Sequence, residues 1–227
     1  MEEKIRILKL SRSASEVSVT ISALEDPVVV PEHIVHKHRL KEDIIITPSQ
    51  LEMLRTESEL FRCDRTAARM LAAREHSTGE IRTKLARKSF TADAIQRIIR
   101  KYKDRGVLDD ARYAHRLANN LLTQRPCGRA YLVACLQRRM IDRSLAEETA
   151  DVALTGKDEK ELATAALAKK WDEYRQLELE VIRRKSYNYL ARRGFGYEAA
   201  RVAFEQLHER QKPVIHPRRT DGEVSRD

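Results

Sequence analysis

The sequence is poor in aromatic residues and has no long apolar run. Aromatic side chains make up 5% of the 227 residues, whereas charged side chains make up 35%. This composition is typical of solvated helical proteins rather than of β-sandwiches. No apolar stretch approaches the roughly 20 residues of a membrane helix, and the start Met1-Glu2-Glu3 is wrong for a secretion signal. We therefore expect a soluble, cytoplasmic protein that does not contact a membrane.

Cysteine is also scarce, and catalytic motifs are lacking. Cys63, Cys127 and Cys135 form no CxxC pair and are odd in number, which predicts reduced and mostly buried thiols in a reducing cytosol. The sequence has no nucleophile–base pair, no Walker loop and no glycine-rich phosphate cradle. We expect no enzymatic activity and no cofactor.

Two groups of residues invite a metal-site interpretation, but both have a simpler one. Asp109 and Asp110 are adjacent on an expected helix, so they do not face each other, and no further acidic cluster follows at ligand spacing. A helix N-cap with a favourable first-turn charge is the preferred interpretation. His33, His36 and His38 have no cysteine nearby and border a β-rich segment, so we expect surface or interface histidines and no metal.

Positive charge is concentrated in the middle of the chain. Residues 61–150 hold 20 Lys/Arg against 10 Asp/Glu, whereas residues 1–60 hold 8 against 11 and residues 151–227 hold 16 against 14. A localised positive field attracts phosphate-rich or acidic partners and makes association salt-dependent. The alternative is a solvated basic face that has no partner.

The first 46 residues follow a two-residue rhythm. Val17, Val19 and Ile21 alternate with polar residues, as in a half-buried strand. Further short strands are expected at residues 5–7, 28–30 and 44–46, with a helical turn near residues 32–37. Residues 1–46 therefore form a β-rich N-terminal subdomain in this interpretation.

The chain then changes to helical periodicity. Thr47 can cap a helix, Pro48 fits its first position, and Gln50 can reach back to the capping amide. We expect a linking helix over residues 47–66.

Three six-residue stretches superimpose without gaps and indicate an internal repeat. Leu85–Phe90, Leu136–Ile141 and Leu190–Phe195 each run apolar, spacer, two cations, small or flexible residue, apolar, at steps of 51 and 54 residues. Such a period marks stacked supersecondary units, and the apolar spacing favours three helices in each. The expected segments are repeat 1 at 67–106, repeat 2 at 107–156, repeat 3 at 157–210 and a flexible tail at 211–227.

The repeated cation pairs predict a binding face. Cations in a last helical turn also complement the helix dipole, and this explains one pair well. Three pairs in register with neighbouring cations favour a functional surface. Tyr131, Tyr187 and Trp171 could stack on bases, but their helical spacing is more typical of a core. The predicted partner- or DNA-binding residues are Arg74, Arg82, Lys84, Arg87, Lys88, Arg125, Arg129, Arg138, Arg139, Arg192 and Arg193.

Several motifs resemble one bacterial family. Gly106-Val107-Leu108-Asp109-Asp110-Ala111-Arg112-Tyr113-Ala114 is similar to the GxLDDxxFA signature of RecX proteins, which modulate the RecA recombinase. Arg74-Glu75-His76-Ser77 with Glu80 and Leu85, Gln124–Gly128 and Arg192–Phe195 are also placed as in that family. The resemblance covers about residues 48–207. Ser89 and Met140 occupy positions where the family usually has glycine. The structural signature comprises Ser77, Glu80, Gly106, Leu108, Asp109, Asp110, Gly128 and Gly194.

The resemblance implies a mainly α fold, with tandem three-helix repeats in an elongated, curved array. It also implies a monomer that binds the RecA–DNA filament and inhibits RecA ATPase, filament extension and strand exchange, as part of DNA repair, homologous recombination and the SOS response. DNA phosphates within the filament would be contacted, and single- or double-stranded DNA could be bound directly. Two alternatives stay open: a DNA-binding helical module that acts without RecA, and a helical protein–protein scaffold.

Overall fold

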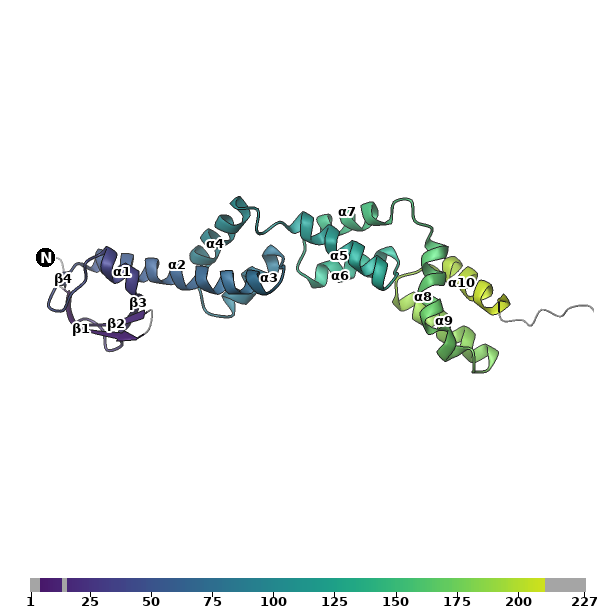
Figure 1. The fold of residues 1–227 in the computed structure, drawn as a ribbon, viewed down its shortest axis with the longest axis horizontal. Helices are drawn as coiled ribbons and strands as arrows, with labels where there is room; N and C mark the ends of the chain where they lie inside the picture. The colour runs from purple at the N-terminus through teal and green to yellow at the C-terminus, as the bar shows by residue number, and fades with distance from the viewer. Residues whose placement is uncertain (1–4, 14–15, 211–227) are drawn as a thin grey trace, which may run out of the picture. The chain divides into compact units, whose positions relative to one another are not determined.

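The computed structural model describes residues 5–13 and 16–210 of the chain (Figure 1). Within these ranges it has ten helices and four strands. The predicted flexible tail at 211–227 lies outside the described residues. Among the helices of the described ranges, none combines the length and apolar character that a membrane span requires.

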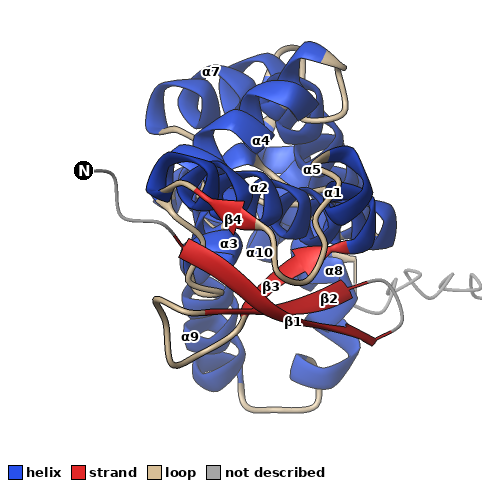
Figure 2. Ribbon diagram, turned by 90° about the vertical axis from the view of Figure 1, so that its left-hand side faces the viewer, coloured by secondary structure: helices blue, strands red, loops and turns tan. Residues whose placement is uncertain are grey.

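The strands form one small antiparallel sheet near the N-terminus (Figure 2). Their order is β3-β2-β1-β4, with β1 at Ile5–Ser13, β2 at Glu16–Ile21, β3 at Val28–Pro31 and β4 at Ile45–Ile46. Val17, Val19 and Ile21 are buried, so the alternation predicted from the sequence is confirmed. The short helix α1 occupies Glu32–Lys37, where a helical turn was expected.

The three clustered histidines have separate neighbours. The ring of His33 lies 4.4 Å from that of Phe61. His38 Nε2 lies 2.9 Å from a carboxylate oxygen of Glu57, and His36 Nε2 lies 3.8 Å from Glu32. Each histidine therefore contacts a different side chain, and two of these, Glu57 and Phe61, lie beyond the N-terminal subdomain.

Helix α2 spans Pro48–Ala73 and begins with the predicted capping box. The Thr47 side chain accepts a hydrogen bond from the Gln50 amide, and the Gln50 side chain accepts one from the Thr47 amide. The expected boundary at 66/67 falls inside this helix, because no glycine or proline interrupts it after Pro48. Leu51 and Leu54 belong to the core of the sheet, whereas Cys63 and Ala67 belong to the core of the first repeat. One helix thus contributes side chains to both cores (Figure 1).

The rest of the first repeat is formed by α3 at Thr78–Ala86 and α4 at Ala92–Asp104. Ile81, Leu85 and five residues of α4 pack with α2 in one buried cluster. Gly106 follows α4 with φ of 65°, in the left-handed conformation that ends helices and that glycine adopts at little cost.

The second repeat comprises α5 at Asp110–Gln124, α6 at Arg129–Arg138 and α7 at Arg143–Leu154. The third comprises α8 at Glu159–Tyr174, α9 at Leu179–Arg192 and α10 at Tyr197–Glu209. Trp171 is buried against Phe204, with ring centroids 6.0 Å apart. Tyr187 also packs against this core. The prediction of a mainly helical fold with three-helix repeats and a small N-terminal strand segment is confirmed.

The described residues divide into two compact units. The first extends to Tyr113 and includes residues Arg138–Asp142, and the second contains Ala114–Gln137 and the chain from Arg143 onward.

Candidate functional site

A buried carboxylate joins the first repeat to the turn after α6. Glu80 is only 9% exposed. The two terminal guanidinium nitrogens of Arg74 donate to its carboxylate oxygens, at 2.9 and 3.3 Å. Arg139 Nη1 lies 3.5 Å from Glu80 Oε1. The Ser77 amide donates to the same carboxylate at 3.2 Å. Burial by itself would raise the pKa of Glu80, but the hydrogen bonds from Arg74 and Ser77 outweigh it, and the net pKa is lowered.

The neighbouring signature residues complete this joint. The Ser77 hydroxyl caps α3 by accepting from the Glu80 amide at 3.0 Å, and it also donates to the Arg139 carbonyl. Asp110 accepts from the Thr78 amide at 2.7 Å. Asp109 instead caps its own helix, accepting from the Arg112 amide at 2.9 Å. The two adjacent carboxylates therefore cap two different helices.

An equivalent joint lies within the second unit, between the start of α6 and the turn after α9. The Gly128 amide donates to the Arg193 carbonyl at 2.9 Å. The Arg193 guanidinium donates to the Pro126 carbonyl at 3.0 Å and lies 5.0 Å from the centre of the Tyr131 ring. The second cation of the pair in repeat 3 thus contacts repeat 2, just as Arg139 contacts repeat 1.

The turn that follows each basic pair has the same backbone conformation. The φ angles are 60° at Ser89, 55° at Met140 and 76° at Gly194. Ser89 and Met140 therefore adopt the left-handed conformation that Gly194 adopts in repeat 3, at a steric cost that glycine avoids. A side chain on Gly79 would collide with Met140, and one on Gly128 would collide with the Gly194 backbone. Both joints therefore require a glycine at the contact.

Four of the predicted binding arginines have intramolecular partners. Arg74 and Arg139 contact Glu80, Arg193 contacts Pro126, and Arg129 forms an ion pair with Asp151. Sequence periodicity alone does not reveal these contacts, since three of the four join segments at least 22 residues apart. A role for these arginines in partner binding stays a prediction.

The other predicted cations differ in exposure and in their partners. Lys84 is half-buried, and its ammonium lies 2.7 Å from His76 Nε2. Arg138 is exposed at the end of α6. The remaining predicted cations are exposed and form no ion pair with any residue of the described ranges: Arg82, Arg87, Lys88, Arg125 and Arg192.

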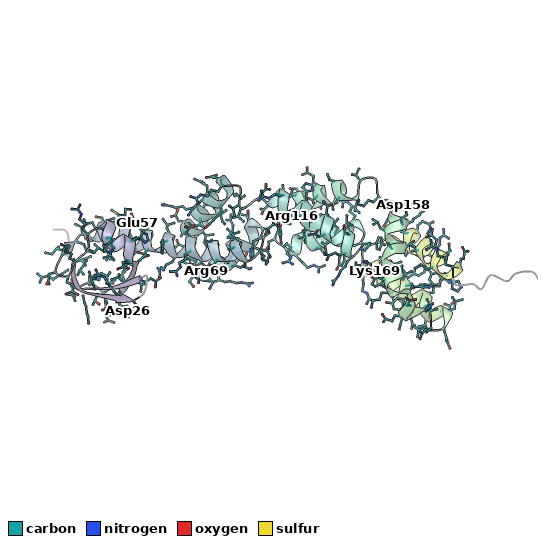
Figure 3. The ribbon with its side chains drawn as sticks, in the orientation of Figure 1. Asp26, Glu57, Arg69, Arg116, Asp158 and Lys169 are labelled. Carbon is teal, nitrogen blue, oxygen red and sulfur yellow. The ribbon has the colours of Figure 1, made fainter. Side chains whose placement is uncertain are left out.

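One hollow of about 520 Å³ gathers several cations of the first repeat. Arg69 on α2 lines it together with Arg74, Lys84 and Lys88. Figure 3 shows Arg69 on α2, a residue that the sequence motifs did not indicate because it belongs to no repeat-specific pair. Helical periodicity would have placed Arg69 on the same face of α2 as Arg62, about two turns farther along.

His76 forms the floor of this hollow. Its side chain accepts from the Lys84 ammonium and donates through Nδ1 to the Arg74 carbonyl at 2.9 Å, an arrangement that needs a neutral ring. Burial lowers the pKa of His76, and the positive charges of Arg74 and Lys84 lower it further. The hollow therefore holds His76 in its neutral form.

Comparison with known proteins places these motifs in a family. Residues 65–101 match the model of the first three-helix domain of RecX, and residues 158–204 match that of the third. The regulatory protein RecX of Chromohalobacter salexigens is 31% identical over 145 residues, which cover 63% of this chain and 91% of that protein. The protein of the same name from Chlorobium phaeobacteroides is 29% identical over 147 residues, covering 62% and 90%.

Two solved structures share the fold. A crystal structure of regulatory protein RecX superimposes with a TM-score of 0.60 at 18% identity, over 90% of this chain and 99% of that one. The RecX structure from Lactobacillus salivarius gives 0.57 at 21% identity, over 66% and 97%. The repeats, the joints and these similarities lead to one conclusion: the chain belongs to the RecX family.

Proposed function

We propose that this protein binds the RecA–DNA filament through the basic surface of its helical repeats and inhibits RecA ATPase, filament extension and strand exchange. Membership of a family of regulatory proteins supports a protein partner. The observation that carries the proposal is the exposed group at the end of α3, where Arg87 and Lys88 have no ion pair in the described chain.

Electrostatics supports a partner that carries DNA. Residues 61–150 hold 20 cations against 10 carboxylates, and exposed cations steer association with phosphates and make it salt-dependent. Protein contacts to RecA would add the specificity that phosphate contacts lack. In this proposal the protein acts in the cytoplasm, within recombinational DNA repair and the SOS response.

The test is a RecA ATPase assay on single-stranded DNA with this protein titrated in. Wild-type protein should inhibit hydrolysis at or below an equimolar ratio to RecA. The double reversal Arg87→Glu/Lys88→Glu should raise the half-inhibitory concentration at least about tenfold, because phosphate contacts dominate such affinities. The matched control is Arg100→Glu/Lys103→Glu on α4, where both residues are exposed. Absence of inhibition by the wild type at any ratio up to equimolar contradicts the proposal.

A DNA-binding module that acts without RecA is the second candidate, favoured by the basic hollow around Arg69. Binding of the same variants to naked DNA and to preassembled RecA–DNA filaments separates the two. A much greater loss on filaments supports the filament regulator, whereas equal losses support the DNA module. Unchanged binding on both, without salt dependence, supports a protein–protein scaffold. Reversal of Arg139 is unsuitable for this test because it would also break the contact with Glu80.

A further inference from the structure

Helix α2 carries a row of arginines that faces the N-terminal sheet. Arg62, Arg65 and Arg69 are three and four residues apart, so they follow one side of the helix. A hollow of about 530 Å³ is lined by these arginines, by Ser13 at the end of β1 and by Glu16 at the start of β2. This hollow adjoins the 520 Å³ hollow of the first repeat, because Thr66, Arg69 and Lys88 line both. We call the two together the α2 furrow.

Most charged residues that line the α2 furrow are cations. Its lining includes one carboxylate, Glu16, and six Arg or Lys residues: Arg62, Arg65, Arg69, Arg74, Lys84 and Lys88. Arg69 and Lys88 are exposed and form no ion pair within the residues that the structure describes. Arg62 donates through Nε to the Ser58 carbonyl at 3.4 Å and keeps its charge unneutralised.

Nearby carboxylates on α2 are occupied elsewhere. Asp64 accepts from the Lys101 ammonium at 2.6 Å. Glu59 accepts from both the amide and the hydroxyl of Thr91, at 2.6 and 2.9 Å. Both therefore cross-link α2 to the α4 side of the repeat, which leaves Arg69 and Lys88 for an anionic ligand.

The next hollow along α2 shows where this character ends. It measures about 720 Å³ and is lined by Arg55 and Arg62 but also by Glu25 and Asp26. Figure 3 labels Asp26 at the strand end of the first unit. Two cations facing two carboxylates offer no net attraction for phosphate. The anion-binding part of α2 therefore extends from Arg62 to Arg69, since the guanidinium of Arg74 is bound to Glu80.

We propose that the α2 furrow binds the phosphodiester backbone of a DNA strand, with the β1–β2 hairpin as one wall. The segment from Arg62 to Arg69 rises roughly 10 Å along the helix, which matches about three phosphates of a B-form strand. Phe90, half-buried in the lining, gives the strand an apolar edge beside Lys88. The N-terminal sheet thereby acquires a role as part of a DNA-binding cleft. This inference extends the proposed function. It rests on that function only in assigning Lys84 and Lys88 to a binding surface.

The experiment measures DNA binding by the full chain in the absence of RecA. Fluorescence anisotropy with a labelled 20-nucleotide oligo-dT and with a 20-base-pair duplex is followed from about 50 to 200 mM salt. Arg62→Ala/Arg69→Ala should weaken binding about tenfold at 100 mM salt. The slope of log K against log salt should fall by about 1.4 on the single strand or about 1.8 on the duplex, since each lost phosphate contact removes about 0.7 or 0.9. The DNA form on which the double variant shows the expected fall in slope is the ligand.

The matched control is Arg100→Ala/Lys103→Ala on α4, which removes the same charge from the same repeat. Equal effects of the two double variants on both slopes would overturn the proposal, because net charge alone would then explain the loss. Thermal unfolding of each variant verifies that it is folded. Failure of the wild type to bind either DNA form at 50 mM salt would also overturn it.

A second pair of variants tests the hairpin wall. Ser13→Glu places a carboxylate in the α2 furrow and should weaken DNA binding at least about fivefold. Ser11→Glu adds the same charge to the same strand, about 7 Å farther along, and should have a clearly smaller effect. Equal effects would remove the hairpin from the cleft. These assays contain no RecA, so a negative ATPase result would contradict the filament proposal without changing the outcome for the α2 furrow.

Discussion

Asp110 accepts a hydrogen bond from the backbone amide of Thr78 at 2.7 Å, so a carboxylate at the start of α5 caps the start of α3. The two residues are 32 positions apart. A free amide at a helix N-terminus needs a partner, and a negative charge is favourable there. The second aspartate of the LDD motif is therefore a cap for another helix rather than for its own.

Replacement of Asp110 should destabilise the first unit. Asp110→Ala leaves the Thr78 amide without this acceptor and removes a favourable charge, so we expect a loss of about 1–2 kcal/mol in the free energy of unfolding. Urea denaturation followed by circular dichroism measures it. Asp104→Ala, at an exposed aspartate on α4, is the control and should not lower stability. A loss no greater than that of the control would show that the cap contributes nothing.

Glycine at Ser89 should stabilise the protein. The φ angle of 60° is costly for serine and nearly free for glycine, and the exposed side chain has no hydrogen bond in the described chain. We expect Ser89→Gly to gain about 0.5–1 kcal/mol, the relief of strain exceeding the added backbone entropy of the unfolded state. Met140→Gly should gain less, because the Met140 sulfur accepts from the Thr83 hydroxyl at 3.2 Å. Thermal melts that show a lower midpoint for Ser89→Gly would contradict the prediction.

A methyl group at Gly128 should disrupt the second joint. Its Cβ would overlap the Gly194 carbonyl, a backbone atom that cannot rotate away. We expect Gly128→Ala to cost about 2 kcal/mol or more, as overpacking against backbone does. Gly156→Ala is the comparison, since Gly156 has a positive φ of 73° but open space around its Cβ position, whereas Gly128 has the close contact without a positive φ. A loss for Gly128→Ala no greater than that for Gly156→Ala, measured by urea midpoints, would contradict a dominant role of the close contact.

Stability should fall as the pH is lowered through the range where His76 titrates. The pKa of His76 is lowered in the folded protein from 6.5, mainly by burial, so the unfolded chain binds more protons below that pH. The contribution of the neutral ring is complete above pH 6.5 and is lost as the pH falls toward the lowered folded pKa. The lowered pKa of Glu80 adds a loss of the same sign below 4.5. His76→Gln should flatten the dependence of the urea midpoint on pH between 6.5 and 5. An unchanged slope would be inconsistent with a neutral His76 in the native state.

Local features of the fold were predictable because neighbouring residues encode them. The capping boxes at Thr47 and Ser77 and the stop at Gly106 each depend on residues within one helical turn. The strand at Val17–Ile21 follows from alternation alone. The expected boundary at 66/67 lies inside α2, because a change of packing partner along a helix leaves no mark on its backbone periodicity.

The repeat, the basic pairs and the family motifs are properties of the amino-acid sequence by itself, since each is a short pattern recurring at fixed spacing. Only the tertiary structure decided what those residues do. It turned Arg139 toward Glu80, 59 residues away, and Arg193 toward Pro126, 67 residues away. It also brought the β1–β2 hairpin opposite Arg62 and Arg69. The physical reason is that a cationic residue looks the same in the sequence whether its side chain pairs with a buried carboxylate, faces solvent or binds a phosphate. Only the packing of the folded chain decides between these.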